Sequence, residues 1–351
     1  LGAARLLGGG APLAQRLLFA SMYAFGAGGA AALFSRFCTS PVVVVVGGVL
    51  AAFNLFTLSF LPNYLPVVAI GVVGLVVAAA VDAARGDLPV RRLVVATLPL
   101  GYVAMTPPLI AVVTVLVVVS PPVAAVLTGT GRAGIRRVGR LLVRAAPYLV
   151  VCNLWWALPQ RAAVAAAQAG DSIGTEIDVR SWAWTHRNNS PANLMTLRSD
   201  WSWPDPQTHG TAASLGRPAL AWLAWLLPLC VALAPLVARR SRRSAAALAV
   251  GCVGLWVLAK GLHPPFASFN AFLYDRVPGF WLLREPMSKV VVVLLPAMLL
   301  SWGLAVEGIA EWRTHARRRL RPLLSGVLVL FVAGPLVLTW PLATGRATRD
   351  E

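Results

Sequence analysis

Apolar residues in this chain fall in long runs that short polar segments separate. A helix that crosses the hydrocarbon core of a bilayer needs about 20 predominantly apolar residues. Runs of roughly that length predict eight spanning helices, at 13–34, 41–60, 62–81, 145–161, 218–238, 244–259, 290–310 and 323–342. The pattern predicts an all-α polytopic transmembrane bundle in one membrane domain, 1–345, with residues 346–351 beginning an extracytoplasmic segment.

One further apolar stretch, 93–128, does not fit this pattern. Four prolines interrupt it, at positions 107, 108, 121 and 122, and two full spans within it would each be too short. Membranes tolerate interrupted helices where surrounding protein buries the broken backbone. We therefore expect a tight hairpin of two short helices that enters the membrane and returns to the same side.

The basic residues predict the orientation of the bundle. Cytoplasmic loops of membrane proteins carry an excess of Lys and Arg. Five short segments carry 18 Arg and only three acids, and they are 35–40, 82–92, 129–144, 239–243 and 311–321. We expect these segments to be cytoplasmic loops of a plasma-membrane protein. The long loops 162–217 and 260–289 are then extracytoplasmic.

Composition supports a membrane protein and excludes a soluble one. Hydrophobic residues make up 58% of the 351 residues, charged residues make up 13%, and the mean hydropathy is +0.72. The net charge of +18 would suggest nucleic-acid binding in a soluble protein. Here the basic residues stand in short clusters between spans, so we expect membrane lipid and no nucleic acid as the partner. The four cysteines lack metal-ligand spacing and are expected in the core.

The first long loop is rich in tryptophan. Four indoles occur there together with polar side chains, and the candidates for sugar binding are Trp182, Trp184, His186, Asn188, Trp201 and Trp203. Indole faces stack on sugar rings while polar neighbours bond hydroxyls. The alternative is that these indoles only occupy the headgroup zone, where tryptophan is enriched in every membrane protein.

Three carboxylates precede these indoles, at Asp171, Glu176 and Asp178. A carboxylate beside a membrane can act as a general base or bind a divalent metal ion. The alternative is a solvated loop whose acids only keep it soluble. These residues are therefore weak candidates for the catalytic base, and no metal-ligand set is predicted.

The second long loop holds both lysines of the chain, Lys260 and Lys289. All 29 other cationic residues are Arg, so a compact ammonium at these two positions suggests a phosphate site. Arg284 could add a bidentate fork to such a phosphate, and Glu285 could pair with Arg284 or Lys289. The candidate donor-phosphate residues are Lys260, His263, Arg284, Glu285 and Lys289. The alternative is that the lysines only reach for the headgroups from helix ends.

Several short motifs together resemble the membrane domain of actinobacterial α-(1→3)-arabinofuranosyltransferases and related multi-pass glycosyltransferases. They are Trp182-x-Trp184-Thr-x-x-Asn188-x-Ser190, Asp200-Trp201-x-Trp203, Lys260-Gly261, Pro264-Pro265-Phe266, Val277-Pro278-Gly279-Phe280 and Arg284-Glu285-Pro286-x-x-Lys289. The resemblance covers about residues 1–345. It implies a GT-C fold, a polyprenyl-phosphate sugar donor and a cell-envelope glycan as acceptor. The catalytic base of such enzymes follows their first helix, so we expect this chain to be a fragment that lacks N-terminal helices and that base.

Three functions remain open on the sequence. The first is transfer of a sugar, such as arabinofuranose, from a polyprenyl-phosphate donor to an envelope glycan, with cations or a divalent metal ion stabilising the leaving phosphate. The second is a transporter or flippase of a lipid-linked precursor. The third is a non-catalytic scaffold for envelope assembly. Almost every charge lies in a loop or at a helix end, with Glu307 the nearest exception, which disfavours a transporter.

Overall fold

The structure is a computed structural model that describes residues 10–59, 64–169, 179–199 and 218–339. This described part is helical and contains no strand. Its longer helices are α2 (Ala11–Phe34), α3 (Pro41–Ala52), α5 (Leu65–Arg85), α8 (Pro107–Thr128), α9 (Gly131–Ala169), α13 (Leu226–Val237), α14 (Arg242–Ala259), α15 (Ala267–Arg276), α16 (Pro286–His315) and α17 (Arg321–Val337). Short helices are α4 (Leu55–Ser59), α6 (Val90–Thr97), α7 (Leu100–Val103), α10 (Pro191–Met195) and α12 (Pro218–Leu223), with 3-10 turns η1 (Val179–His186), η2 (Arg239–Ser241) and η3 (Phe280–Leu283).

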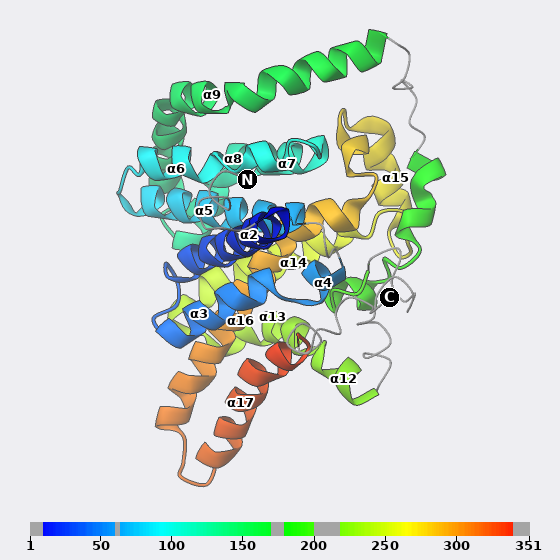
Figure 1. The fold of residues 1–351 in the computed structure, drawn as a ribbon. Helices are drawn as coiled ribbons and strands as arrows, with labels where there is room; N and C mark the ends of the chain where they lie inside the picture. The colour runs from blue at the N-terminus through cyan, green and yellow to red at the C-terminus, as the bar shows by residue number, and fades with distance from the viewer. Residues whose placement is uncertain (1–9, 60–63, 170–178, 200–217, 340–351) are drawn as a thin grey trace.

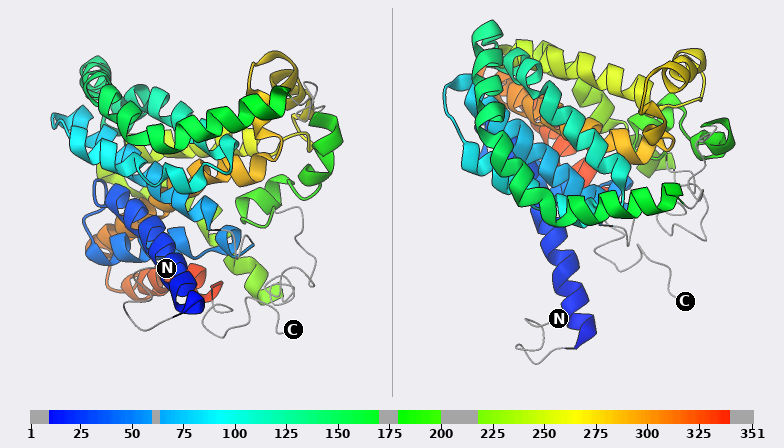
Figure 2. Two further views of the ribbon diagram at one scale, coloured as in Figure 1. Left: turned by 45° about the horizontal axis from the view of Figure 1, so that its top comes forward. Right: turned by 90° about the horizontal axis from the view of Figure 1, so that it is seen from above.

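The helices form one bundle around α5 and α16, which are buried along most of their length (Figure 1). Helix α5 packs against α2, α8 and α9, while α16 packs against α13, α14 and α17. Helix α9 lies at the edge of the bundle, and the start of α2 projects from its side (Figure 2). Tight turns occupy one end of the bundle, and α15 and the segment 179–199 occupy the other.

Seven described helices are long and apolar enough to span a membrane. They confirm a multi-pass membrane protein and cover six of the eight predicted spans, with α8 as the seventh. The predicted spans 218–238 and 323–342 correspond to shorter apolar helices, Ala221–Val237 and Arg321–Val337. The Arg-rich segment 129–144 was expected to be a loop, but only its first two residues form a turn, and α9 begins at Gly131. Arginine is compatible with a helix there, because its long side chain can carry the charge to water.

The predicted hairpin at 93–128 is only partly correct. Its first arm is short and broken between α6 and α7, but its second arm is the single 22-residue helix α8. Pro121 has no N–H to donate to the carbonyl of Val117, four residues earlier. The buried Ser120 hydroxyl donates to that carbonyl at 2.7 Å instead. The side chain before the proline therefore supplies a bond that the proline removes, and the helix continues.

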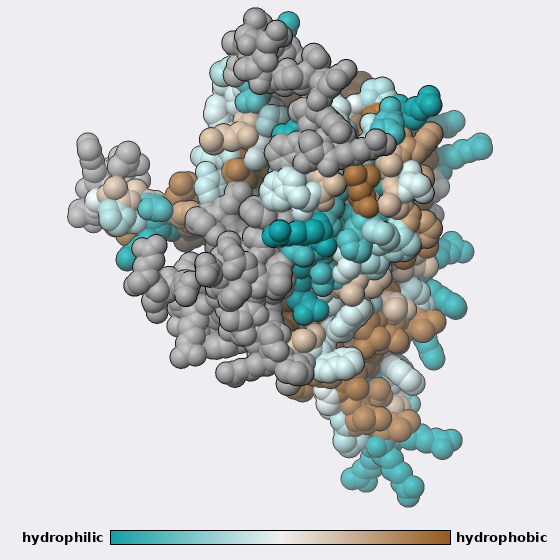
Figure 3. Space-filling view, turned by 90° about the vertical axis from the view of Figure 1, so that its right-hand side faces the viewer, coloured by the Kyte–Doolittle hydropathy of each residue, from teal (hydrophilic) through white to brown (hydrophobic). Residues whose placement is uncertain are grey.

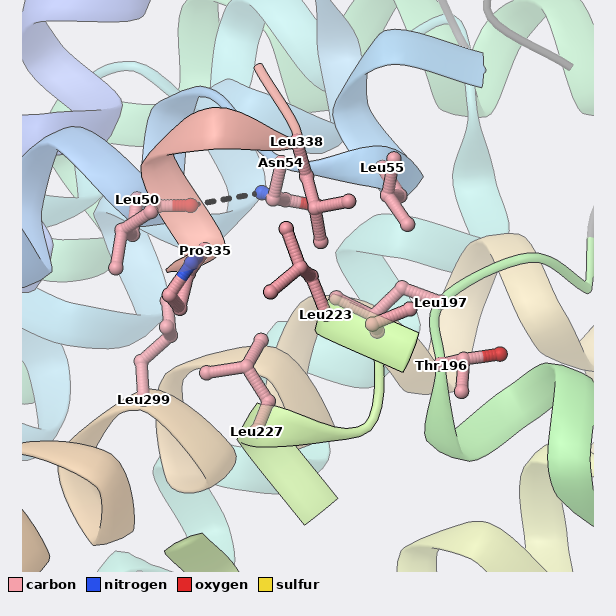
Figure 4. Close-up of a pocket in the computed structure, with 11 residues that line it drawn as sticks. Leu50, Asn54, Leu55, Thr196, Leu197, Leu223, Leu227, Leu299, Pro335 and Leu338 are labelled. Carbon is pink, nitrogen blue, oxygen red and sulfur yellow. Dashed lines mark hydrogen bonds between the residues drawn. The ribbon is translucent and has the colours of Figure 1, made fainter. Parts of the chain in front are cut away.

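Helix α3 ends in the interior of the bundle, where the backbone changes direction before α4. Asn54 is buried there, and its side-chain amide donates to the carbonyls of Leu50 and Ala51 at 3.0 and 3.2 Å (Figure 4). Its amide oxygen accepts from the N–H groups of Phe56 and Thr57. The Asn54 side chain thus bonds carbonyls in the last turn of α3 and N–H groups in the first turn of α4.

The Arg-rich segments meet at one end of the bundle. Asp82 forms ion pairs with Arg36 at 2.9 Å and with Arg92 at 3.2 Å. Arg137 of α9 donates to the carbonyl of Ala84 at 3.0 Å. At the same end, Arg240 pairs with Glu311 at 3.1 Å. We call the end of the bundle that holds these ion pairs and Arg137 the arginine-rich end.

Glu307, the acid that lies farthest inside a predicted span, has a structural partner. Its carboxylate accepts hydrogen bonds from the backbone N–H groups of Thr39 and Ser40, at 2.7 and 2.6 Å. Ser40 is the N-cap of α3, so the carboxylate lies at the positive end of that helix. Glu307 therefore attaches α16 to the start of α3.

Helices α2 and α5 approach so closely that glycine is required between them. A Cβ added to Gly29 would lie 2.2 Å from the carbonyl oxygen of Gly71, and one added to Gly74 would lie 2.3 Å from that of Gly29. Small residues allow such backbone contact in membrane bundles. The neighbouring Gly28 has open space around its Cβ position.

We expect Gly29→Ala to lower the free energy of unfolding by about 1–3 kcal/mol, because the new methyl group forces two backbones apart. Gly28→Ala is the matched control and should leave stability unchanged or slightly higher, since alanine favours helix. Thermal unfolding in detergent would measure both variants. Equal stabilities of the two variants would contradict the close contact.

Candidate functional site

The two predicted extracytoplasmic loops meet at the end of the bundle opposite the arginine-rich end. The meeting point consists of 185–199 from the first loop and 259–289 from the second, and we call it the loop junction. Seen from this end, the described surface carries a hydrophilic patch beside apolar surface (Figure 3). All five candidate phosphate residues lie in the second of these segments.

Lys260 follows the last residue of α14 and is 3% exposed. Its ammonium donates to the carbonyl of His263 and lies 5.7 Å from the centre of the Phe266 ring. Burial lowers the pKa of this ammonium below its ordinary value. Among the described residues it forms no ion pair, although an ammonium has three donors and is costly to bury without an anion.

Lys289 is neutralised within its own helix. Its ammonium pairs with Glu285, four residues earlier, and donates to the Ser288 hydroxyl at 2.7 Å. Of the two partners that the sequence offered for Glu285, the structure therefore shows Lys289. The Arg284 guanidinium lies 5.9 Å from the Trp281 ring centre. The Lys289 ammonium is thus paired with a carboxylate, whereas the Lys260 ammonium is bonded to a backbone carbonyl.

His186 joins the two loops through both of its ring nitrogens. The backbone N–H of Leu262 donates to Nδ1 at 3.1 Å, so Nδ1 carries no proton. Nε2 therefore holds the proton and donates to the carbonyl of Arg284 at 2.7 Å. The ring is 2% exposed, and it lies nearly parallel to the Tyr274 ring at 6.5 Å. This predicted sugar-binding residue thus connects loop backbones in the structure.

Two buried asparagines complete the end of α14. Asn189 donates to the carbonyl of Ala259 at 3.2 Å, and Asn270 donates to those of Val257 and Gly261 at 2.8 and 2.7 Å. The last carbonyls of a helix have no partner inside the helix, so side chains must satisfy them where water is excluded. Both asparagines are fully buried. They fix the backbone around Lys260 and leave two buried amide oxygens without a donor among the described residues.

Tyr274 connects α15 to the part of the second loop that contains η3. Its hydroxyl donates to the carbonyl of Leu283 at 2.9 Å, and its ring makes an edge contact with Phe280 at 4.9 Å. Burial raises the pKa of this phenol. Sequence reasoning missed Tyr274, Asn189 and Asn270. Asn270 lies between apolar residues, which is an available signal, whereas Asn189 stands in a polar run and Tyr274 precedes two charged residues.

The remaining candidates are only partly placed. Trp184 is about half exposed (49%), and the backbone carbonyl of Asn188 accepts from the Asn193 side chain at 2.9 Å. His263 bonds the carbonyl of Pro264 with Nδ1 at 2.7 Å. The following candidates lie outside the described residues or side chains: Asp171, Glu176, Asp178, Trp182, Trp201 and Trp203.

Two further observations concern a small cavity and possible metal ligands. An apolar cavity of about 20 Å³ lies between the α3–α4 break, α13 and the segment 196–197, and has room for about one water molecule (Figure 4). In the described part of the chain, no three His, Cys, Asp or Glu residues gather as metal ligands do.

Comparison with protein-family models, with curated proteins and with solved structures finds no match to this chain.

The lowered pKa of His186 predicts a pH dependence of stability. Burial lowers this pKa, while the hydrogen bond to Arg284 and the charge of Glu285 raise it by less. As pH falls below about 6.5, the unfolded chain binds a proton that the folded ring resists. The contribution of His186 to the free energy of unfolding is therefore fully present above about pH 6.5. It decreases as the pH falls from there to the lowered pKa of the folded state, by at most about 1.4 kcal/mol per pH unit.

His186→Gln tests this dependence because the glutamine amide can still donate to Arg284 but does not titrate. We expect the native protein to lose more stability than this variant between pH 6.5 and pH 5. Denaturant unfolding in detergent at both pH values gives the comparison. Parallel stability curves for the two proteins would show that His186 does not remain neutral in the fold.

Proposed function

We propose that the chain is the membrane domain of a glycosyltransferase that uses a polyprenyl-phosphate sugar donor, and that the loop junction binds the donor phosphate. The observation that carries the proposal is the buried Lys260 ammonium, which has one carbonyl partner and no ion pair among the described residues. A phosphate oxygen is the anion that would complete its hydrogen bonds. The junction lies at the end of apolar helices, where a lipid phosphate would be located.

The electrostatic arrangement favours Lys260 as the primary phosphate contact. Lys289 already pairs with Glu285, so its charge is available only if that pair opens. Arg284 stands in the same loop, and its planar guanidinium can bind two phosphate oxygens at once. The proposal therefore assigns phosphate binding to Lys260 first, with Arg284 as a second contact.

The proposed reaction is a single displacement at the anomeric carbon. An acceptor hydroxyl oxygen attacks this carbon, the bond to the phosphate oxygen breaks, and polyprenyl phosphate leaves with the electron pair. A carboxylate takes the hydroxyl proton, and Lys260 and Arg284 stabilise the charge that develops on the leaving phosphate. The donor sugar, arabinofuranose in the resembling family, and the envelope glycan acceptor follow from that resemblance alone.

The same proposal places the junction outside the cytoplasm and the arginine-rich end inside it, because basic residues accumulate on the cytoplasmic side. A transporter of lipid-linked precursors gains no support from Glu307, since its carboxylate is bonded to the start of α3. The enzyme is therefore the function that the described residues support best.

Binding of decaprenyl-phosphate-arabinose to the full-length protein in nanodiscs tests the proposal. We expect Lys260→Met to weaken donor binding at least about tenfold, which is the scale of one lost charge-assisted hydrogen bond. Arg319→Ala, an exposed arginine at the opposite end, is the matched control and should bind the donor as the native protein does.

Stability separates a binding defect from misfolding. Lys260→Met keeps the apolar stem and removes a buried charge, so the free energy of unfolding without donor should stay within about 1 kcal/mol or rise. Undiminished donor binding by a folded Lys260→Met protein would remove the phosphate assignment. Donor binding without sugar transfer by the full-length protein would instead overturn the enzymatic part.

A further inference from the structure

A second basic site lies at the arginine-rich end, far from the loop junction. Arg137, Arg140 and Arg144 of α9 face the turn that follows α5, and together with Gly86, Asp87 and Leu88 they line a cavity of about 230 Å³. Gly86 has a φ of 135°, which lets the chain leave α5 sharply and opens this space. The cavity is independent of the proposed transferase site.

The charges around this cavity are not balanced. Three arginines face one acid, and no ion pair joins Asp87 to any of them among the described residues. The Arg137 side chain donates to the carbonyl of Ala84, whereas the side chains of Arg140 and Arg144 are exposed and make no hydrogen bond among the described residues. Like charges three to seven residues apart on one helix face repel each other, so a bound anion would stabilise the arrangement.

An apolar stripe continues from the arginines along α9. Pro147 interrupts α9 just after Arg144, and beyond it Val151 and Leu158, seven residues apart, lie on one face of the helix. Both are more than half exposed (67% and 56%), and α9 lies at the edge of the bundle (Figure 2). Tyr148, which is 58% exposed, stands one turn from Arg144, as aromatic residues do at a membrane interface.

We infer that this cavity binds the phosphate headgroup of an anionic glycerophospholipid, with the acyl chains along the Val151 and Leu158 stripe. The arginines supply forked donors for phosphate oxygens, and the stripe supplies an apolar surface directly beyond them. A soluble phosphate compound would use the arginines alone, and a zwitterionic lipid would gain little from them. The combination of cavity, charge and stripe therefore selects an anionic lipid.

Native mass spectrometry of the full chain in detergent, titrated with phosphatidylglycerol, tests this inference. The double variant R140Q/R144Q should bind this lipid at least about tenfold more weakly, while the control R318Q/R319Q stays within about twofold of the native protein. The control removes two exposed arginines from the same end of the bundle. All four positions are exposed, and R140K/R144K, which keeps both charges, should lose less binding than R140Q/R144Q.

Two further probes separate the possible ligands. Phosphatidylcholine with the same acyl chains should bind more weakly than phosphatidylglycerol, and inorganic phosphate alone should not displace the lipid. Equal binding of the two lipids, displacement by phosphate, or equal losses in the two Gln pairs would each overturn the inference. A loss confined to R140Q/R144Q with preference for phosphatidylglycerol would support it.

Discussion

Backbone hydrogen bonding in apolar surroundings is the constraint on which the rest of this structure depends. A carbonyl or N–H group without a partner is costly where water is excluded, so every interruption of a helix needs a substitute. Ser120 supplies one beside Pro121, Asn54 supplies several between α3 and α4, and Glu307 supplies two at the start of α3. These polar residues let α8 continue past its prolines, let the chain turn between α3 and α4, and satisfy the start of α3.

The same constraint positions the loop junction. The end of α14 is buried, so its carbonyls are bonded by Asn189 and Asn270, one from each loop. His186 then joins the first loop to the backbone on both sides of the second. Lys260 is carried into the interior because it follows the helix end that these residues satisfy. Its burial is therefore a consequence of how α14 ends, and its lack of an ion pair among the described residues is the basis of the proposed phosphate site.

Much of the fold could be predicted from the sequence, because the thickness of the bilayer sets the length of an apolar spanning helix. Arginine is favoured in the segments between such helices. The prediction failed at Pro121 and Pro122, where a neighbouring serine compensates for the missing bond, and at 129–144, where arginines lie on a helix. The two lysines stood out by their rarity. Their different environments could not be predicted, because Lys289 pairs locally whereas Lys260 depends on loop contacts. The bond between His186 and Leu262 joins residues 76 positions apart, and no local pattern indicates it.

An experimental structure of the full-length protein with a bound polyprenyl phosphate would show whether the loop junction binds the phosphate. We expect density for the phosphate at the loop junction, with an oxygen about 2.7–2.9 Å from the Lys260 ammonium, as in other charge-assisted hydrogen bonds. The His186 and Asn270 contacts should remain as they are without the lipid. Phosphate density elsewhere in the protein, with the Lys260 ammonium still bonded only to His263, would contradict the account.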